Sequence, residues 1–400
     1  MREGWTETTL GDVAELISRG RAPSYCEDDG VIVLNQKCVR NGRILFEFAR
    51  RTDISKKAIP EWAYLMAGDT LINSTGVGTL GRASFVSHLN GPTTFDSHVT
   101  LVRPRPNSCL PSFIGLNLNF RETEIEMFAG GSTGQTELSR EAVNAFPISL
   151  PPLVVQKRIV DVVSSADAYI DALQQQAETA RTARNAVLHE LLSAGGDDWT
   201  ETTLGDVASW GSGGTPKSGE AAYYGGDIPW CVIGDLTEGE VFQTEKRITA
   251  DGLRNSSAKV IEPGAVMVAM YGASIGRTGL AAVPMATNQA IAFAYPKIEM
   301  LNNLFLLAFL QTQKSQFIEA GQGAAQSNIS QTVLKAWPIL LPPLVEQTLI
   351  VEIVSSMDEV IQSTEQALLD AKNLRSSLLS DLLSGEHEIP ASYDELLKVA

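Results

Sequence analysis

Short apolar runs rich in β-branched residues are separated by glycine, proline and asparagine through most of the chain. This is the pattern of strands and turns. In the first half, the pattern predicts strands at VIVLN (31–35), TLINST (70–75) and HVTLV (98–102). In the second half, it predicts strands at IPWCVI (228–233), AVMVAMY (265–271) and AIAFAY (290–295), and helix within 301–320. We therefore expect an α+β chain with two globular parts of mixed structure and twisted sheets.

Two long stretches carry a different pattern, in which apolar residues recur at steps of three and four. The first has this seam at Val163, Ala166, Ile170, Leu173, Ala177, Ala180, Val187 and Leu191. The second has it at Val354, Met357, Ile361, Thr364, Leu368, Ala371, Leu378 and Leu382. Each stretch predicts a helix of about 40 residues, about 60 Å long. Pairing the two helices would bury both stripes; the alternative is that each helix packs on its own globular part.

The predicted helices have recognisable ends. Each follows the sequence LPPL (150–153 and 341–344), and proline is tolerated at a helix start because the first amides have no intrahelical acceptor. A methyltransferase Pro-Pro motif would need a polar residue before the prolines and an aromatic one after them, which leucine does not supply. Glycines at 195–196 and 385 are typical of helix C-caps.

The chain repeats itself. WTETTLGDVA occurs at 5–14 and again at 199–208, and the LPPL segments repeat at a similar offset. A repeat of this length is the size of a domain with its connector. We predict globular domains at 1–150 and 199–341, spacer helices within 151–198 and 342–386, and an acidic tail at 387–400. A pseudo-twofold axis relating the halves would make the helices antiparallel, a coiled-coil rod with a globular domain at each end.

Charge is unevenly distributed. The net charge of −16 comes mostly from the connectors, because residues 151–208 carry −5 and residues 337–400 carry −8. The two large segments, 1–150 and 209–336, carry only −2 and −1. A nearly neutral domain can present one basic face, so the total charge does not exclude DNA as a partner. With no apolar run of about 18 residues and no apolar stretch at the N-terminus, we expect a cytoplasmic protein without membrane contact.

Both halves keep a glycine loop that ends in arginine. It consists of Gly76, Gly81 and Arg82 in the first half, and of Gly272, Gly276 and Arg277 in the second. Such a loop lets the backbone approach a phosphate with a positive charge beside it. The alternative is a tight hairpin with a surface arginine. Although GVGTLG (76–81) has dinucleotide-binding spacing, the second copy loses it, so we predict no cofactor in this chain.

Other motifs are less informative. GQTELS (134–139) and AQSNIS (325–330) match each other, and their side chains are suited equally to capping a helix or to touching phosphates. The four histidines have no repeat partners and no metal spacing, and the four cysteines are expected to be reduced thiols. Common catalytic motifs are absent, so we predict that the chain binds no metal ion and is not itself an enzyme.

Arginine interrupts the apolar seam at the same place in each helix, at Arg184 and Arg375. Symmetric arginines on a seam could fix the register of paired helices through a buried polar contact. The alternative is that both side chains extend to solvent along the helix surface.

These features occur in the same order in both halves of the chain. Together they resemble the specificity (S) subunit of type I restriction–modification systems. The resemblance rests on the TLGDVA opening of each half, on GGDIPWCVIGDLTEG (225–239), on the glycine loop with arginine, on QSNIS, and on Gln156 and Gln347 after each LPPL. It spans nearly the whole chain. The first half departs from it at VIVLNQKCVRNG (31–42).

The resemblance implies that each globular part is a target recognition domain for one half of a bipartite, asymmetric site in double-stranded DNA. It implies that the helices set the gap between half-sites and dock two modification subunits. Those subunits would bind S-adenosylmethionine and methylate adenine, and restriction subunits could join them. Base contacts should be few and carried by loops. The candidates are Lys37, Arg40, Arg82, Tyr271, Arg277, Asn288 and Gln289. The main alternative is a DNA-binding or protein-binding adaptor without a methyltransferase partner.

Overall fold

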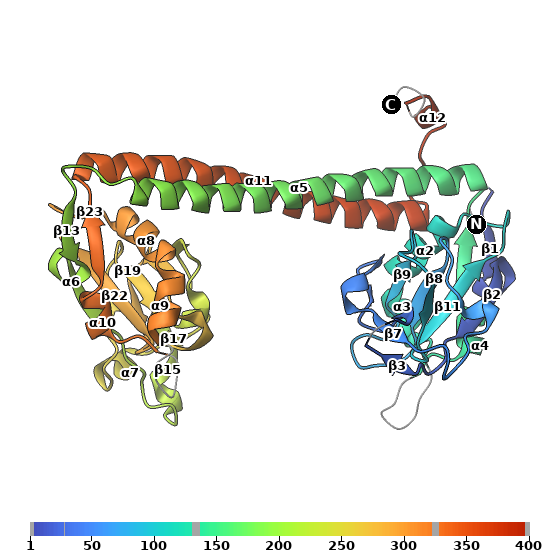
Figure 1. Cartoon of the computed structure of the whole chain (residues 1–400), viewed down its shortest axis with the longest axis horizontal. Coiled ribbons are helices and arrows are strands. Elements are labelled where there is room, and N and C mark those ends of the chain that lie inside the picture. The colour runs from blue at the N-terminus through green and yellow to red at the C-terminus, as the bar shows by residue number, and fades with distance from the viewer. Residues whose placement is uncertain (1–3, 28, 130–136, 322–327, 397–400) are drawn as a thin grey trace. The chain divides into compact units, whose positions relative to one another are not determined.

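The computed structural model describes residues 4–27, 29–129, 137–321 and 328–396. The chain forms two compact units. Unit 1 comprises residues 1–172 and 368–400, and unit 2 comprises residues 173–367 (Figure 1). Each unit therefore contains one globular part together with parts of both long helices. Within the described ranges, no helix is long and apolar enough to cross a membrane.

Unit 1 is built on two four-stranded sheets, ordered β2-β11-β8-β9 and β10-β4-β7-β3, with two small two-stranded pairs, β1-β12 and β5-β6. Its strands are β1 (Thr6–Thr9), β2 (Ala14–Arg19), β3 (Tyr25–Cys26), β4 (Val31–Leu34), β5 (Val39–Arg40), β6 (Arg43–Ile44), β7 (Arg50–Thr52), β8 (Thr70–Asn73), β9 (Ala83–Phe85), β10 (Thr93–Phe95), β11 (Val99–Pro104) and β12 (Pro147–Leu150). The three strands predicted in this half are β4, β8 and β11.

Unit 2 repeats this plan with sheets ordered β14-β22-β19-β20-β16 and β17-β15-β21-β18, and the pair β13-β23. Its strands are β13 (Thr200–Thr203), β14 (Ala208–Ser212), β15 (Tyr224–Cys231), β16 (Glu240–Val241), β17 (Arg247–Ile248), β18 (Val260–Ile261), β19 (Val266–Ala269), β20 (Thr278–Ala281), β21 (Met285–Thr287), β22 (Ile291–Pro296) and β23 (Pro338–Leu341). In both units the second sheet contains one parallel pair, β4 with β10 and β15 with β21. The predicted α+β class is confirmed.

Short helices cover one face of each first sheet. In unit 1, α2 (Pro111–Phe120) packs on β8, β9 and β11; in unit 2, α8 (Asn303–Thr312) packs on β19, β20 and β22 (Figure 1). The helix predicted within 301–320 is in fact two helices, because α8 ends before Gln313 and α9 begins after it. The remaining short helices are α1 (Leu10–Val13), α3 (Glu122–Met127), α4 (Arg140–Ala145), α6 (Leu204–Val207), α7 (Ala250–Arg254), α9 (Lys314–Gly321), α10 (Gln331–Lys335) and α12 (Tyr393–Leu396).

The two long helices are α5 (Leu153–Ser193) and α11 (Leu344–Ser384). Each begins directly after its Pro-Pro pair, as predicted, and each is followed by a glycine with positive φ, Gly195 (+63°) and Gly385 (+63°). Left-handed backbone at this position ends a helix without the steric cost that a Cβ would add. The LPPL segments therefore start helices.

Parts of the two long helices lie side by side within each unit. In unit 2, Arg181 contacts Glu365 and Arg184 contacts Asp358, so higher numbers on α5 meet lower numbers on α11. This order shows that the segments are antiparallel. Most seam residues are buried or half-buried, including Val163, Ile361 and Thr364. The helices also pack on the globular parts, since Ile159 and Leu382 belong to the unit 1 core. Both predicted alternatives therefore occur, because the apolar stripes pack against each other and also against the globular parts.

The seam arginines make the same contact in both copies of the repeat. Arg184 donates to both carboxylate oxygens of Asp358 at 3.0 and 3.2 Å. Arg375 donates to those of Asp167 at 2.5 and 3.0 Å. The Arg184 side chain is only 11% exposed, so it lies against the seam instead of extending into solvent.

A buried glutamine ties the start of each long helix to its globular part. Gln156 is 1% exposed and accepts from the Leu110 amide at 2.8 Å, while its side-chain amide donates to the Pro151 carbonyl at 2.8 Å. Gln347 is 0% exposed and accepts from the Asn302 amide at 2.8 Å. It also donates to the carbonyl oxygens of Met300 and Pro342, both at 2.8 Å. The repeat therefore preserves both the residue and its bonding pattern.

Candidate nucleic-acid interface

Three loops meet at one end of the first sheet in unit 1. They follow β8 (residues 74–82), precede β11 (96–98) and precede α4 (137–139). Backbone hydrogen bonds join them: the Ser74 amide donates to the His98 carbonyl at 2.9 Å, and the Leu138 amide donates to the Ser74 carbonyl at 2.9 Å. Segments distant in sequence are thereby held together as one surface.

Unit 2 joins the corresponding three loops by the same bonds. The Met270 amide donates to the Ala290 carbonyl at 2.8 Å, and the Ile329 amide donates to the Met270 carbonyl at 2.9 Å. The tight turn before the strand is also kept, because Asp96 in unit 1 and Asn288 in unit 2 each accept from the amide two residues later. The backbone framework is shared by the two units.

The side chains on this shared framework differ between the units. The equivalent backbone hydrogen bonds show which residues of the two units correspond to each other. By this match, Thr75, Ser97 and His98 of unit 1 correspond to Tyr271, Gln289 and Ala290 of unit 2. A constant backbone with different side chains at the loop tips is an arrangement suited to two surfaces that read different sequences.

The glycine loops with arginine are the tips of β-hairpins, connecting β8 to β9 and β19 to β20. Gly76 and Gly81 have φ of +100° and +84°, which favours glycine. Arg82 donates to the Gly78 carbonyl at 2.6 Å and thereby braces its own loop. Gly272 and Gly276 also have positive φ, and Arg277 follows them half-buried. The interpretation of these loops as tight hairpins is therefore confirmed, while their contact with nucleic acid stays a prediction.

Most predicted contact residues lie on or beside these loops. Tyr271, Asn288 and Gln289 belong to the unit 2 loops, where Gln289 accepts a hydrogen bond from Thr215. Lys37 is exposed next to Gln36, which bonds to Thr75 of the hairpin loop. Arg40 lies elsewhere, on the β5-β6 hairpin, whose Arg43 pairs with Asp171 of α5 at 2.8 Å.

The serines ahead of α4 and α10 cap those helices. Ser139 accepts from the Ala142 amide at 3.0 Å, and Ser330 accepts from the Val333 amide at 3.2 Å. Capping satisfies an otherwise unpaired helix amide. The structure thus favours the capping interpretation for these two residues. The glutamines of the same motifs, at 135 and 326, lie outside the described residues.

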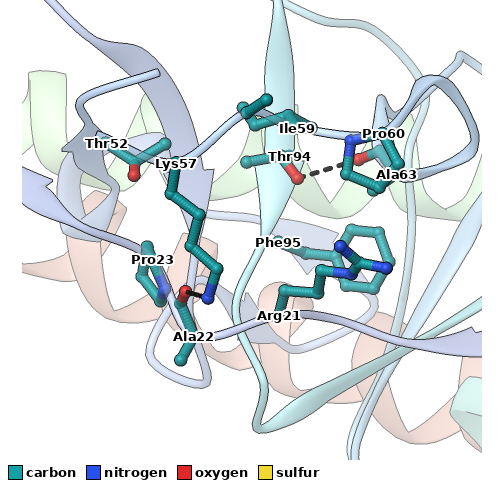
Figure 2. Close-up of a pocket in the computed structure, with 11 residues that line it drawn as sticks. Arg21, Ala22, Pro23, Thr52, Lys57, Ile59, Pro60, Ala63, Thr94 and Phe95 are labelled. Carbon is teal, nitrogen blue, oxygen red and sulfur yellow. Dashed lines mark hydrogen bonds between the residues drawn. The ribbon is translucent and has the colours of Figure 1, made fainter. Parts of the chain in front are cut away.

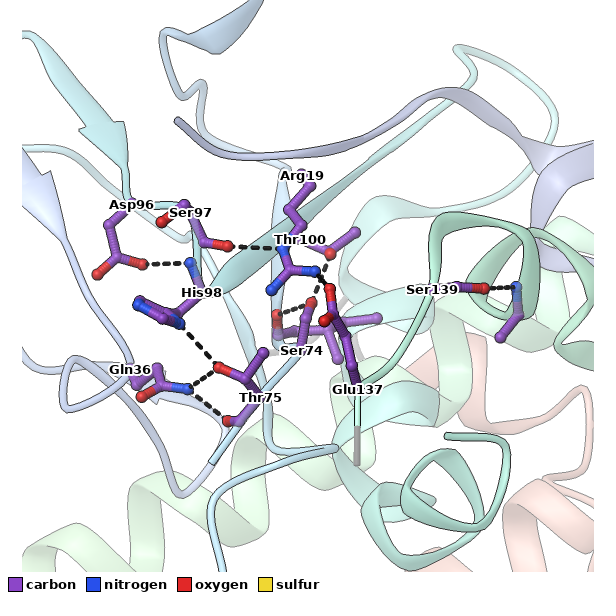
Figure 3. A network of polar contacts seen from close by, with 12 residues as sticks. Arg19, Gln36, Ser74, Thr75, Asp96, Ser97, His98, Thr100, Glu137 and Ser139 are labelled. Carbon is purple, nitrogen blue, oxygen red and sulfur yellow. Dashed lines mark hydrogen bonds and ion pairs between the residues drawn. The ribbon is translucent and has the colours of Figure 1, made fainter. Parts of the chain in front are cut away.

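A polar network that was not predicted from the sequence lies at the centre of the unit 1 loops (Figure 3). Arg19 donates to the Ser97 carbonyl at 2.6 Å and forms an ion pair with Glu137. Thr75 shares a hydrogen bond of 2.9 Å with the Nδ1 atom of His98. The pKa of Asp96 is raised because the carboxyl is buried. A histidine without a repeat partner carries no sequence signal, since only the fold brings its neighbours to it.

A basic and aromatic surface adjoins this network in unit 1. The guanidinium of Arg50 lies 3.5 Å from the ring centre of Tyr25, and that of Arg21 lies 5.7 Å from that of Trp62. Arg21 and Lys57 line a cavity of about 30 Å³ with Phe95 on its wall (Figure 2). A cavity of this size has room for a few water molecules at most, too little to enclose a nucleobase. The surface is therefore suited to outer contacts with phosphates and sugars.

The described residues offer little else for chemistry. Among them, no group of three or more histidine, cysteine, aspartate or glutamate side chains is placed to hold a metal ion. The cysteines are free thiols, and burial raises the pKa of Cys38 and Cys109 to about 11 and that of Cys231 to about 12. Because the thiolate is the reactive form, these three are poor nucleophiles near neutral pH.

Comparison with known proteins identifies the repeat. The model of the type I restriction modification DNA specificity domain matches residues 2–180 and again residues 196–371. Among curated proteins, the putative type I restriction enzyme MjaX specificity subunit of Methanocaldococcus jannaschii is 22% identical over 408 aligned residues. The alignment covers 96% of this chain and 94% of that protein.

Solved structures share the fold. The type I restriction–modification S subunit of M. genitalium aligns with a TM-score of 0.57 and 16% identity, covering 95% of this chain and 96% of that one. A chain from a structure of type I restriction–modification complex assembly and conformational transition aligns with a TM-score of 0.60 and 18% identity, covering 96% and 98%. With both halves matched by the family model, the chain belongs to the family of type I restriction–modification DNA specificity proteins.

Proposed function

We propose that this chain is the DNA sequence-recognition subunit of a type I restriction–modification complex, in which each unit reads one part of a bipartite, asymmetric site. The observation that carries the proposal is the three-loop surface, which has the same backbone bonds in both units but different side chains. Lys37, Arg82, Tyr271, Arg277, Asn288 and Gln289 are proposed contacts, with Arg40 the least favoured by its position. The basic surface around Arg21 and Arg50 would add phosphate contacts.

We further propose that two modification subunits dock on the long helices, and that these subunits bind S-adenosylmethionine and methylate adenine. Restriction subunits can then join the complex. The support from this chain is the apolar surface that α11 leaves exposed, at Leu344, Val345, Leu349, Val360, Leu369 and Leu374. Large exposed apolar side chains commonly mark protein–protein contacts. This chain would then supply specificity, and its partners the catalysis.

Deleting the gene for this chain should abolish methylation of one bipartite motif across the host genome. Methylated adenines would be mapped with the gene present, absent and restored, because restoration separates the loss from secondary mutations. We expect one motif with two defined halves and a fixed gap to disappear and return. If the system methylates DNA in the parent strain and that map does not change, the chain serves as an adaptor of another kind.

The symmetric salt bridges lead to a prediction about helix register. Replacing both Arg184 and Arg375 with leucine removes both bidentate contacts, each contributing about 1 kcal/mol because the partner carboxylates are partly exposed. Without them, the helices can slide along an otherwise apolar seam. We expect methylation at sites whose gap is changed by one base pair, or reduced assembly with the modification subunits.

The control is Arg181→Leu, which removes an exposed ion pair with Glu365 that lies beside Arg184. Exchanging the charges within each pair (R184D with D358R, and R375D with D167R) should restore the original gap. An unchanged gap and unchanged assembly in the double leucine variant would rule out the register role.

A further inference from the structure

The orientation of Gln36 can be assigned from its partners. Its Nε2 atom contacts the Thr75 backbone carbonyl, which can only accept, so this atom must be the amide nitrogen. The same nitrogen lies 2.8 Å from the Thr75 hydroxyl oxygen. The amide therefore donates to the carbonyl and to the hydroxyl of Thr75 (Figure 3).

The Thr75 hydroxyl then directs its own proton to His98. Since the hydroxyl oxygen already accepts from Gln36, its proton is free to donate, and the Nδ1 atom of His98 lies 2.9 Å away. A neutral imidazole that accepts at Nδ1 carries its hydrogen at Nε2. The relay from Gln36 through Thr75 thus favours one tautomer of His98.

The backbone of His98 is also held in place. Its amide donates to the Asp96 carboxylate at 2.9 Å, and its carbonyl accepts from the Ser74 amide at 2.9 Å. The preceding residue, Ser97, is held by Arg19 through its carbonyl. Hydrogen bonds therefore hold both the ring and the backbone of His98 in place at the middle of the joined loops.

Three side chains beside the His98 ring are already engaged in contacts within the loops. Arg19 is occupied by the Ser97 carbonyl and by Glu137, and the hydroxyls of Ser74 and Thr100 bond to each other. By contrast, His98 is exposed, and its Nε2 atom has no hydrogen-bond partner among residues 4–27, 29–129, 137–321 and 328–396. His98 therefore presents a donor in a fixed direction on the loop surface.

We propose that the Nε2–H group of His98 reads a hydrogen-bond acceptor on the edge of a base, as a specificity-determining contact of unit 1. This rests on the proposed function and deepens it. Suitable acceptors are purine N7, guanine O6 or thymine O4 in the major groove. A single neutral donor in a set direction discriminates well, because an amino group opposite it would leave two donors facing each other.

The corresponding residue of unit 2 is Ala290, which has no polar side chain. The contact therefore belongs to the half-site that unit 1 reads. Changes at His98 should leave the other half-site untouched, which provides an internal reference in each experiment.

The test is methylation by the full complex with its modification subunits, using DNA that carries every base in turn at each position of both half-sites. The complex with unaltered protein is expected to discriminate about tenfold to hundredfold at the position that His98 reads. In His98→Ala, discrimination at that position should fall to within about threefold, while all other positions keep their preference. Thr75→Val keeps the imidazole but removes the hydroxyl that orients it. Discrimination at the same position should therefore fall less than in His98→Ala.

His88→Ala is the matched control, since His88 is exposed in the same unit and its Nδ1 atom shares a hydrogen bond with the adjacent Ser87. An unchanged preference in His98→Ala, or an even decline for all sequences in that variant, would overturn the proposal; an even decline that His88→Ala does not share is the signature of a phosphate contact. If the unaltered complex itself showed no bipartite preference, the proposed function would fail instead, so the two failures are distinguishable.

Discussion

Gly213→Ala is expected to lower the free energy of unfolding of unit 2 by about 3 kcal/mol or more. A Cβ atom at this position would lie closer than 3.0 Å to the backbone carbonyl of Thr287, where no real Cβ is found. The obstacle is main chain, so no side-chain rotation can relieve it. The next residue, Gly214, donates to the same carbonyl at 2.9 Å, which holds the two segments together.

The change can be followed by tryptophan fluorescence during urea unfolding, because Trp199, Trp210, Trp230 and Trp337 all lie in unit 2. Gly219→Ala is the control, since nothing lies within 4 Å of its added Cβ. Equal unfolding midpoints for the two variants would show that the crossing backbones can separate at little cost. Gly20, beside the Asp96 carbonyl in unit 1, should behave as Gly213 does.

Gln347→Met is expected to destabilise unit 2 by about 3 kcal/mol, because it removes one acceptor and two N–H donors from a fully buried site. Methionine has a similar volume, so the loss is one of hydrogen bonds and not of packing. The Asn302 amide and the carbonyl oxygens of Met300 and Pro342 would lose their bonds to the glutamine. The start of α11 would then be less firmly held to the globular part.

Urea unfolding of Gln347→Met would be compared with Gln362→Met, an exposed position on the same helix. We expect a clear drop in the midpoint for the first and almost none for the second. A drop of the same size in both variants would contradict the anchoring role and point to a general effect of methionine in α11. Gln156→Met should have a smaller effect on unit 1, because Gln156 makes two such bonds where Gln347 makes three.

Repetition and local pattern were enough to predict the duplicated domains, the α+β class and the two long helices. The ends of α5 and α11 followed from Pro-Pro and glycine, since both residue types act through the backbone of their own segment. The strands β4, β8 and β11 were recognisable because their side chains are mostly buried and their sequences are rich in β-branched residues. Helix 301–320 was harder, because no proline or glycine marks the break at Gln313.

The partners of individual side chains were decided by the tertiary structure alone. Arg184 could be recognised on its seam, but only the pairing of α5 with α11 places Asp358 opposite its guanidinium. Gln347 was noticed as a motif residue, yet its partners lie more than 40 residues away in sequence at Met300 and Asn302.

The same limit applies to the candidate interface. His98 gains a directed donor only because Gln36 and Thr75, from two other loops, are brought beside it. Sequence pattern therefore determined which elements form, since burial and backbone conformation are properties of each segment. Which polar atoms meet was decided by the folded chain, because a hydrogen bond depends on distances between segments that no local pattern records.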